Sequence, residues 1–461
     1  MSAVALASTV LALPSPAEPL EARATSAASS SLPTVTVKGN AFYAGDDRFF
    51  IRGVDYQPGG SSQAIDPIAD TSLCTRDIAK FKDLGINTVR IYTVDNSANH
   101  DECMSLLASA GIYLVLDVNT PKYSLNRASP EASYNAVYLQ SIFATIDAFS
   151  KYSNTLAFFS GNEVINDDTT TNAAPYVKAV TRDMRQYIGS RGYRSIPVGY
   201  SAADVSENRM QMAHYMNCGT DDERSDFFAF NDYSWCDPSS FTTSGWDQKV
   251  KNFTGYSIPI FLSEYGCIDG EYRHFDETAA LYNPEMTGVY SGGLVYEYTE
   301  EGNGYGLVKV SGSTVNDQTD YDFLKSVFAK NPAPTDGAGS STSSTASTCP
   351  PKDANWNVTT DALPAIPEKA KSYMSSGAGT GPGLTGAGSQ NAGGTSTGSA
   401  APGSGSVTAV ASGSGTATSS TASATSTKKS AAGSGPQPLE RSAMMVGAVV
   451  IGFTMLGMAL L

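Results

Sequence analysis

Residues 156–164 read Leu-Ala-Phe-Phe-Ser-Gly-Asn-Glu-Val and residues 258–266 read Ile-Pro-Ile-Phe-Leu-Ser-Glu-Tyr-Gly, and these two stretches decide the fold. Each is an apolar run that closes on a carboxylate, Glu163 in the first and Glu264 in the second. Nearly continuous apolar character is typical of parallel strands that are buried on both faces. Six further runs of this kind, rich in Val, Ile, Phe and Tyr, lie at residues 49–56, 88–94, 113–119, 196–201, 227–234 and 293–299.

Helical patterns separate the runs. Apolar residues recur at helical spacing in residues 74–84, 101–110, 136–150, 175–189 and 277–282, and Gly85 and Gly111 stand where the first two should stop. Strand and helix alternating over about 250 residues predict an α/β protein built as a (β/α)8 TIM barrel. The alternative is a doubly wound open sheet, but residues 55–58 (Asp-Tyr-Gln-Pro) replace the glycine-rich phosphate turn expected after its first strand.

The composition limits the partners. The chain has 461 residues, 16% charged, and a net charge of −15. A nucleic-acid partner calls for a basic patch, so the acidic balance argues against one and suits a neutral ligand.

Both ends indicate secretion. Residues 3–13 are apolar and small residues follow, which predicts a signal peptide over 1–17 and a leader over 18–34; a disordered apolar start is the alternative. Residues 443–461 are uncharged and follow a polar spacer, which predicts a GPI-anchor signal over 437–461 that is removed; a tail-anchored transmembrane helix is the alternative. We therefore expect a protein held by a GPI anchor on the outer face of the cell membrane and in the cell wall.

The amino-acid composition changes after the barrel domain, which we place at residues 35–332. Residues 333–374 hold Cys349 and Trp356 and are expected to pack on the barrel as an extension. Residues 375–436 are almost wholly Gly, Ser, Thr and Ala, so they predict a disordered, O-glycosylated stalk.

Six cysteines fit an oxidising compartment, and the absence of any Cys-x-x-Cys pair argues against zinc. Six cysteines allow 15 pairings, and their positions alone do not choose among them. Asn252 and Asn357 open N-glycosylation sequons, which also arise by chance.

The two carboxylates indicate the chemistry. In an eight-stranded barrel Glu163 would follow the fourth strand and Glu264 would end the seventh, so they would face each other across one mouth. Such a pair cleaves glycosidic bonds: Glu163 would be the acid/base and Glu264 the nucleophile, about 5–5.5 Å apart, with retention of configuration. One glutamate alone would mean little, because most are solvated surface residues; two at the ends of apolar strands indicate function.

Other polar and aromatic residues fall at the same strand ends. Asn162 is placed to bind a sugar 2-hydroxyl, and Tyr233 to donate its hydroxyl to Glu264. Arg90 either supports the carboxylates or forms a structural ion pair. The other residues expected to support the pair are Asp55, Gln57 and Asp117, and the tyrosines expected either to stack on sugar rings or simply to pack are Tyr56, Tyr92, Tyr123, Tyr296 and Tyr298.

The motifs at these strand ends, in order, resemble one family, the fungal GPI-anchored β-1,3-glucanosyltransferases of glycoside hydrolase family 72. The resemblance runs from about residue 35 to 330 and rests on Gly53-Val54-Asp55-Tyr56-Gln57-Pro58, Arg90-Ile91-Tyr92, Ser160-Gly161-Asn162-Glu163-Val164, Phe230-Asn231-Asp232-Tyr233-Ser234-Trp235-Cys236, Phe261-Leu262-Ser263-Glu264-Tyr265-Gly266-Cys267 and Gly292-Gly293-Leu294-Val295-Tyr296-Glu297-Tyr298. Only Cys349 lies beyond residue 267, so the chain resembles the subgroup without a cysteine-rich carbohydrate-binding module.

The resemblance implies an activity and a residue set. Such an enzyme cleaves an internal β-1,3 bond of a donor glucan and transfers the new end to the non-reducing end of another chain, with no cofactor or metal, as a monomer. It implies disulfides Cys74–Cys103, Cys218–Cys349 and Cys236–Cys267. The rivals are a plain β-1,3-glucan hydrolase and a non-catalytic wall glycoprotein. The residues implied for the substrate groove are Gln57, Tyr92, Asp117, Asn162, Tyr233 and Tyr296.

Overall fold

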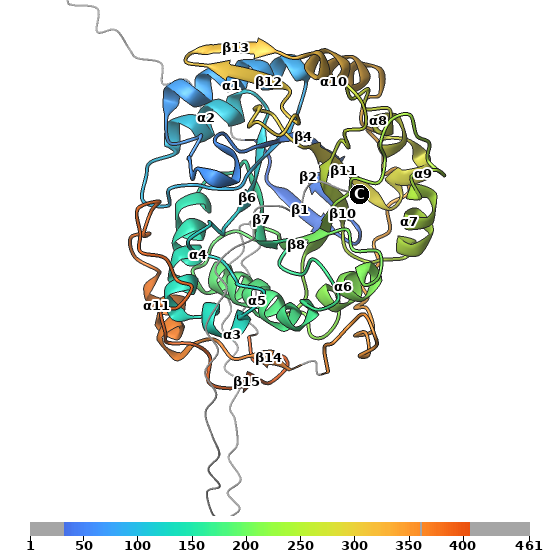
Figure 1. Cartoon of the computed structure of the whole chain (residues 1–461). Coiled ribbons are helices and arrows are strands. Elements are labelled where there is room, and N and C mark those ends of the chain that lie inside the picture. The colour runs from blue at the N-terminus through green and yellow to red at the C-terminus, as the bar shows by residue number, and fades with distance from the viewer. Residues whose placement is uncertain (1–31, 360–361, 406–461) are drawn as a thin grey trace, which may run out of the picture. The chain divides into compact units, whose positions relative to one another are not determined.

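A computed structural model describes residues 32–359 and 362–405. Its centre is a closed barrel of eight parallel strands, joined in chain order with the last strand pairing the first (Figure 1). Each strand falls within, or overlaps, one of the eight apolar runs, so the (β/α)8 prediction is confirmed. The barrel strands are β4 (Ile51–Tyr56), β5 (Thr88–Ile91), β6 (Tyr113–Asp117), β7 (Thr155–Asn162), β8 (Val198–Ala203), β9 (Phe227–Asn231), β10 (Ile260–Tyr265) and β11 (Tyr290–Val295).

Helices surround the barrel, and local signals set their ends. In α1 (Thr71–Leu84) the Asp70 side chain accepts the first N–H groups, and Gly85, at φ 72°, ends the helix. The other helices around the barrel are α2 (Asp101–Ser109), α3 (Pro130–Ser133), α4 (Ala136–Phe149), α5 (Ala174–Ser190), α6 (Arg209–Met216), α7 (Trp246–Phe253), α8 (Glu277–Leu281), α9 (Pro284–Thr287) and α10 (Thr319–Lys330). The sequence patterns did not predict α3, α6, α7, α9 or α10; the first four of these have only four to eight residues, and α6 has no periodic apolar stripe.

A small antiparallel sheet closes one end of the barrel. It consists of β1 (Val35–Lys38), β2 (Ala41–Ala44) and β3 (Asp47–Phe49). Phe42 is fully buried, with its ring 5.8 Å from that of Phe227 and 5.9 Å from that of Phe261. This plug seals the amino ends of the strands, so the carboxyl ends form the open mouth, where barrel enzymes place their sites.

Three disulfides tie the outer layer together. Cys74–Cys103 joins α1 to α2, Cys236–Cys267 joins the segments after β9 and β10, and Cys218–Cys349 ties the chain beyond the barrel to its wall. These are the three pairs that the family resemblance implies.

The packed extension continues past residue 374, into the segment whose composition predicted a stalk. Ser399–Ala400 (β15) pairs with Leu363–Pro364 (β14), and residues 377–405 lie along the outside of the barrel next to α4 and α5 (Figure 1). Composition missed this packing because backbone groups and small polar side chains make the contacts, with few apolar side chains involved. A second hairpin, β12 (Val308–Ser311) with β13 (Thr314–Asp317), and α11 (Lys371–Ser376) complete the described strands and α-helices.

The segments predicted as signal peptide and GPI signal lie outside the described residues. In residues 32–359 and 362–405, no helix has both the length and the apolar character needed to cross a membrane.

Candidate active site

Glu264 lies inside the barrel mouth, near the end of β10. One carboxylate oxygen accepts hydrogen bonds from the Tyr92 hydroxyl at 2.7 Å and Arg90 Nη1 at 3.2 Å, and the other accepts from the Tyr233 hydroxyl at 2.7 Å. Burial raises the pKa of Glu264 to about 7, against the lowering effect of Arg90 and the two tyrosine hydrogen bonds. Three donors thus fix a carboxylate that is 7% exposed.

Glu163 directly follows β7 and has a left-handed backbone, with φ at 48°. Few residues other than glycine adopt this conformation, and those that do need neighbours that hold it. The Glu163 N–H donates to the Ser201 carbonyl at 2.9 Å, and Arg127 Nη2 donates to the Glu163 carbonyl at 2.6 Å. The side chain is thereby turned into the mouth, half-buried.

Asn231, the last residue of β9, connects this carboxylate to the barrel. Its Nδ2 donates to Glu163 Oε1 at 2.8 Å and to Asn162 Oδ1 at 3.2 Å, and its Oδ1 accepts from the Ser263 hydroxyl at 2.8 Å. Ser201 also donates to Asn162 Oδ1, at 2.7 Å. With Oδ1 occupied, Asn162 has its Nδ2 to offer to a ligand. Asn231 lies within one of the strand-end motifs, but a single asparagine carries no pattern of its own from which a role could be predicted.

Arg90 is the only cation buried among these carboxylates in the part of the chain that the structure describes. Besides Glu264, it binds Asp117, with Nε 2.8 Å from one carboxylate oxygen and Nη2 3.3 Å from the other. Asp55 lies 3.9 Å from Nη1, and its buried oxygens accept no hydrogen bond from a described residue. Arg90 therefore has both expected roles: its ion pairs stabilise the barrel interior, and it supports the Glu264 carboxylate.

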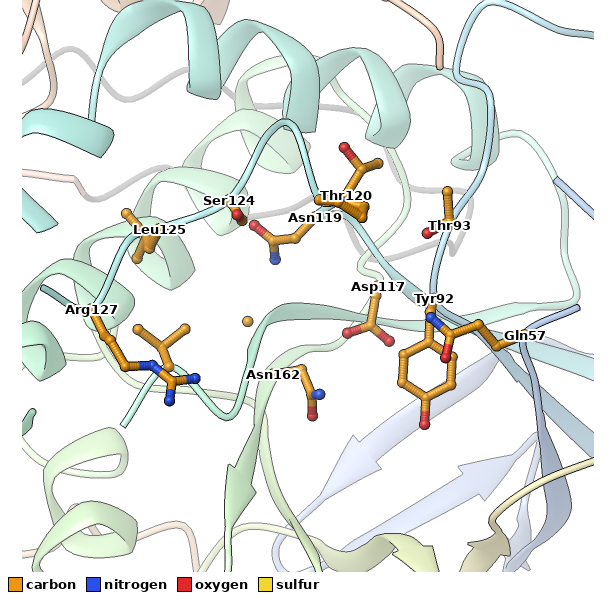
Figure 2. Close-up of a pocket in the computed structure, with 13 residues that line it drawn as sticks. Gln57, Tyr92, Thr93, Asp117, Asn119, Thr120, Ser124, Leu125, Arg127 and Asn162 are labelled. Carbon is orange, nitrogen blue, oxygen red and sulfur yellow. The ribbon is translucent and has the colours of Figure 1, made fainter. Parts of the chain in front are cut away.

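A pocket of about 280 Å³ opens beside the carboxylates. Four residues expected to form the groove line it, namely Gln57, Tyr92, Asp117 and Asn162. In Figure 2 these four lie on one side, facing the loop after β6 that carries Asn119, Thr120, Ser124, Leu125 and Arg127. Most of these groups are polar donors and acceptors, which is what a sugar ring with several hydroxyls requires.

Aromatic rings lie on the other side of Glu264. The Tyr233 ring packs edge-on against Tyr296 at 6.4 Å and against Tyr305 at 5.9 Å. Tyr305 had not been singled out from the sequence, because it lies in the Gly-rich loop that follows β11. Two other tyrosines near strand ends play a different part: Tyr56 and Tyr298 are buried outside the mouth, where both donate to Asp77.

Within residues 32–359 and 362–405, no group of three or more His, Cys, Asp or Glu side chains is arranged to hold a metal ion. The described site combines the Glu163 and Glu264 carboxylates with those of Asp55 and Asp117, the buried Arg90 guanidinium, and amide and phenol groups.

Comparison with known proteins agrees with this geometry. The glucanosyltransferase family, glycoside hydrolase family 72, matches residues 24–332. The chain is 67% identical over 381 residues to 1,3-beta-glucanosyltransferase gel1 of Aspergillus fumigatus, covering 82% of each chain. It is 54% identical over 363 residues to 1,3-beta-glucanosyltransferase GAS5 of Saccharomyces cerevisiae, covering 78% of this chain and 75% of that one.

Among solved structures, a Saccharomyces cerevisiae Gas2p variant in complex with laminaritetraose and laminaripentaose matches with a TM-score of 0.69 and 39% identity, over 74% of this chain and 76% of that one. The family match covers more than half of the chain, and the relatives are highly identical to it. Both findings support the same family as the carboxylate pair at the barrel mouth does. The chain belongs to the glucanosyltransferase family, glycoside hydrolase family 72.

Proposed function

We propose that this enzyme is a retaining β-1,3-glucan transglycosylase in which Glu264 is the nucleophile and Glu163 the acid/base. The observation that carries the proposal is the different setting of the two carboxylates. Glu264 accepts three hydrogen bonds deep in the mouth, whereas Glu163 is half-buried and has one amide donor, from Asn231. A nucleophile must be held ionised and aimed, and an acid/base must exchange its proton, so the settings match these roles.

In the first step a Glu264 oxygen attacks C1 of a donor glucose unit, and Glu163 gives its proton to the departing glycosidic oxygen. The C1–O bond breaks, the reducing-end part of the donor leaves, and a glycosyl ester of Glu264 remains. Loss of the Glu163 proton at this point makes that residue a carboxylate.

In the second step the Glu163 carboxylate takes the proton of the 3-hydroxyl at the non-reducing end of an acceptor glucan. That oxygen attacks C1, the ester bond breaks, and Glu264 is released as a carboxylate with the β configuration restored. Water taking the place of the acceptor would give hydrolysis. We assign the sugar contacts of the donor to Gln57, Asp117 and Asn162, and stacking to Tyr233 and Tyr296.

Protonation of the pair is consistent with the first step. The negative charge of Glu163 is one of the causes that raise the pKa of Glu264. When Glu163 carries the proton needed for acid catalysis, that cause is removed, and Glu264 ionises more readily. The proton on one carboxyl thus favours the charge on the other.

The glucan is the natural substrate class, because the Gas2p structure holds laminari-oligosaccharides and the relatives bear the name 1,3-beta-glucanosyltransferase. The test is to incubate the full-length chain with one reduced laminari-oligosaccharide and follow the product masses over time. Products longer than the substrate are expected. Products that are only shorter would make the enzyme a hydrolase, and an unchanged substrate with a folded protein would make it a binding protein.

We also propose that a GPI anchor holds the enzyme at the outer face of the cell membrane, within the wall that contains its glucan. The uncharged residues 443–461 after a polar spacer support this. Asn252 and Asn357 are exposed, as glycan acceptors must be. Release of the protein from membranes by a phosphatidylinositol-specific phospholipase tests the anchor, and retention after that treatment would argue for a transmembrane helix.

A further inference from the structure

A glycine-rich segment far beyond the barrel lies against the loop that lines the pocket. We call residues 381–390 the strap and residues 119–127 the groove loop. The strap lies 49 or more residues after the end of the family match at 332. Its sequence, Gly-Pro-Gly-Leu-Thr-Gly-Ala-Gly-Ser-Gln, shows no helical or strand periodicity. Its position is set by hydrogen bonds to side chains and backbone of the barrel.

The strap binds three successive residues of the groove loop. Ser389 N–H donates to the Lys122 carbonyl at 3.0 Å, and Lys122 Nζ donates back to the Leu384 carbonyl at 3.0 Å. Gln390 Nε2 donates to the Ser124 carbonyl at 2.8 Å. The hydroxyl of Tyr123, which is 3% exposed, accepts the N–H of Gly388 at 3.2 Å.

The strap is itself anchored to the barrel wall. Asn135, whose side chain caps α4, donates to the Ser389 carbonyl at 2.6 Å, and Ser389 is fully buried. At the other end of the strap, Gly383 N–H donates to Asn96 Oδ1 at 3.0 Å. The strap therefore connects the groove loop to the first turn of α4 and to the segment that follows β5.

The groove loop reaches the site in two ways. Five of its residues line the pocket beyond Asn119: Thr120, Pro121, Ser124, Leu125 and Arg127 (Figure 2). Its last residue, Arg127, holds the carbonyl of Glu163, whose left-handed backbone needs such a partner. Displacement of the loop in the unliganded enzyme would therefore alter the pocket wall and the support of the acid/base residue, and glucan binding would have to restore both.

We propose that the strap is a positioning segment for glucan binding, which keeps the groove loop in the conformation that completes the pocket. This inference rests on the proposed function, because it takes the pocket as the glucan site. Without the strap, the groove loop would populate other conformations. The apparent affinity for glucan would then fall in proportion to the fraction of molecules whose loop is in the binding-competent conformation. Chemistry after binding would change less than binding.

Gly386 offers a sharp test. A Cβ built at this residue would lie 2.2 Å from the Tyr123 hydroxyl and 2.8 Å from Pro382 Cβ, so Gly386→Ala must push the strap and loop apart. Gln390→Ala removes the bond to Ser124 without adding bulk. Gly398→Ala is the matched control, because a Cβ there meets nothing within 4 Å and the backbone needs no positive φ.

The full-length variants are assayed for transfer on a laminari-oligosaccharide, and for trypsin cleavage after Lys122. Gly386→Ala and Gln390→Ala should raise KM about five- to tenfold, the scale of one or two lost hydrogen bonds, with kcat within about twofold of the parent. Both should also speed cleavage after Lys122, and Gly398→Ala should match the parent in every respect. If Gly386→Ala fails to fold, Gln390→Ala decides alone.

Unchanged KM and unchanged cleavage in Gln390→Ala would overturn the role of the strap while leaving the proposed function intact. A parent enzyme that never lengthens the oligosaccharide would contradict the proposed function instead. A third outcome would also overturn the inference. If both variants lowered kcat by the same factor by which they raised KM, and also lowered the melting temperature, the strap would be a purely structural element.

Discussion

Replacing Glu264 by glutamine should stabilise the protein above neutral pH and leave its stability nearly unchanged in acid. In the folded state the pKa of Glu264 is raised from 4.5 to about 7, chiefly by burial. Below pH 4.5 the group is protonated in both folded and unfolded chains and contributes nothing. As the pH rises from 4.5 to 7, the unfolded chain releases a proton that the folded one keeps, so stability falls and stays lower above pH 7.

The size of this loss follows from the two pKa values. A difference of about 2.5 corresponds to about 3 kcal/mol at 1.36 kcal/mol for each pKa unit. Glutamine at 264 does not ionise, and its amide can still accept from Tyr92 and face the Tyr233 hydroxyl. The variant should therefore be more stable than the parent by about 3 kcal/mol at about pH 8, and by less than about 1 kcal/mol at about pH 4.

Urea unfolding followed by tryptophan fluorescence at the two pH values measures both differences. Glu368→Gln is the control, because the Glu368 side chain is 82% exposed and its charge is not buried. An equal difference between parent and Glu264→Gln at the two pH values would refute the reasoning, as would a variant that is less stable at pH 8. A catalytic carboxylate that is kept buried for its function lowers the stability of the fold, so its replacement should raise stability and remove activity together.

Three further outcomes follow from the site. Glu163→Gln and Glu264→Gln should each lower the transfer rate by at least about 100-fold in a laminari-oligosaccharide assay, and near-parental rates in either would remove it from the mechanism. Tyr233→Phe deletes a hydrogen bond that lowers the pKa of Glu264, so the acidic limb of the kcat/KM profile should move to higher pH; a limb that moved to lower pH would contradict this. Replacing Cys218 and Cys349 by alanine should lower the free energy of unfolding by about 2–5 kcal/mol, measured by urea titration, because that bridge closes a long loop.

The barrel was predictable because its strands are buried on both faces, and such runs stand out against polar connections. The short helices and the plug were not. Phe42 looks like any buried phenylalanine until Phe227 and Phe261 are seen to surround it, and that contact joins residues far apart in the sequence. The composition of residues 375–436 predicts a stalk where the structure has the strap, because small residues signal disorder when only their own apolar content is counted. The order of the strap depends on hydrogen-bonding partners that composition does not reveal.

The site residues also fall into two groups, those that a sequence pattern identifies and those that only contacts in the folded chain identify. Glu163 and Glu264 were found because a carboxylate at the end of an apolar strand conflicts with its surroundings unless it is used. Asn231, Arg127 and Tyr305 were missed as site residues, because each acts through a contact made across the mouth and an uncharged or surface-type residue causes no conflict in the sequence. Only the closed barrel brings them next to the carboxylates.

The charges around Arg90 show how this barrel keeps its nucleophile available. One guanidinium faces Asp55, Asp117 and Glu264, so three ionised carboxylates would leave two uncompensated charges in a dry interior. The three carboxylates differ in their hydrogen bonds: Glu264 accepts three, Arg90 contacts both oxygens of Asp117, and Asp55 accepts none among the described residues. Burial raises the pKa of Asp55 well above its usual range, which favours the neutral form of this side chain. A neutral Asp55 leaves the guanidinium to Asp117 and Glu264, and Glu264 then needs to compete with only one other ionised partner for the positive charge that holds it ready to attack.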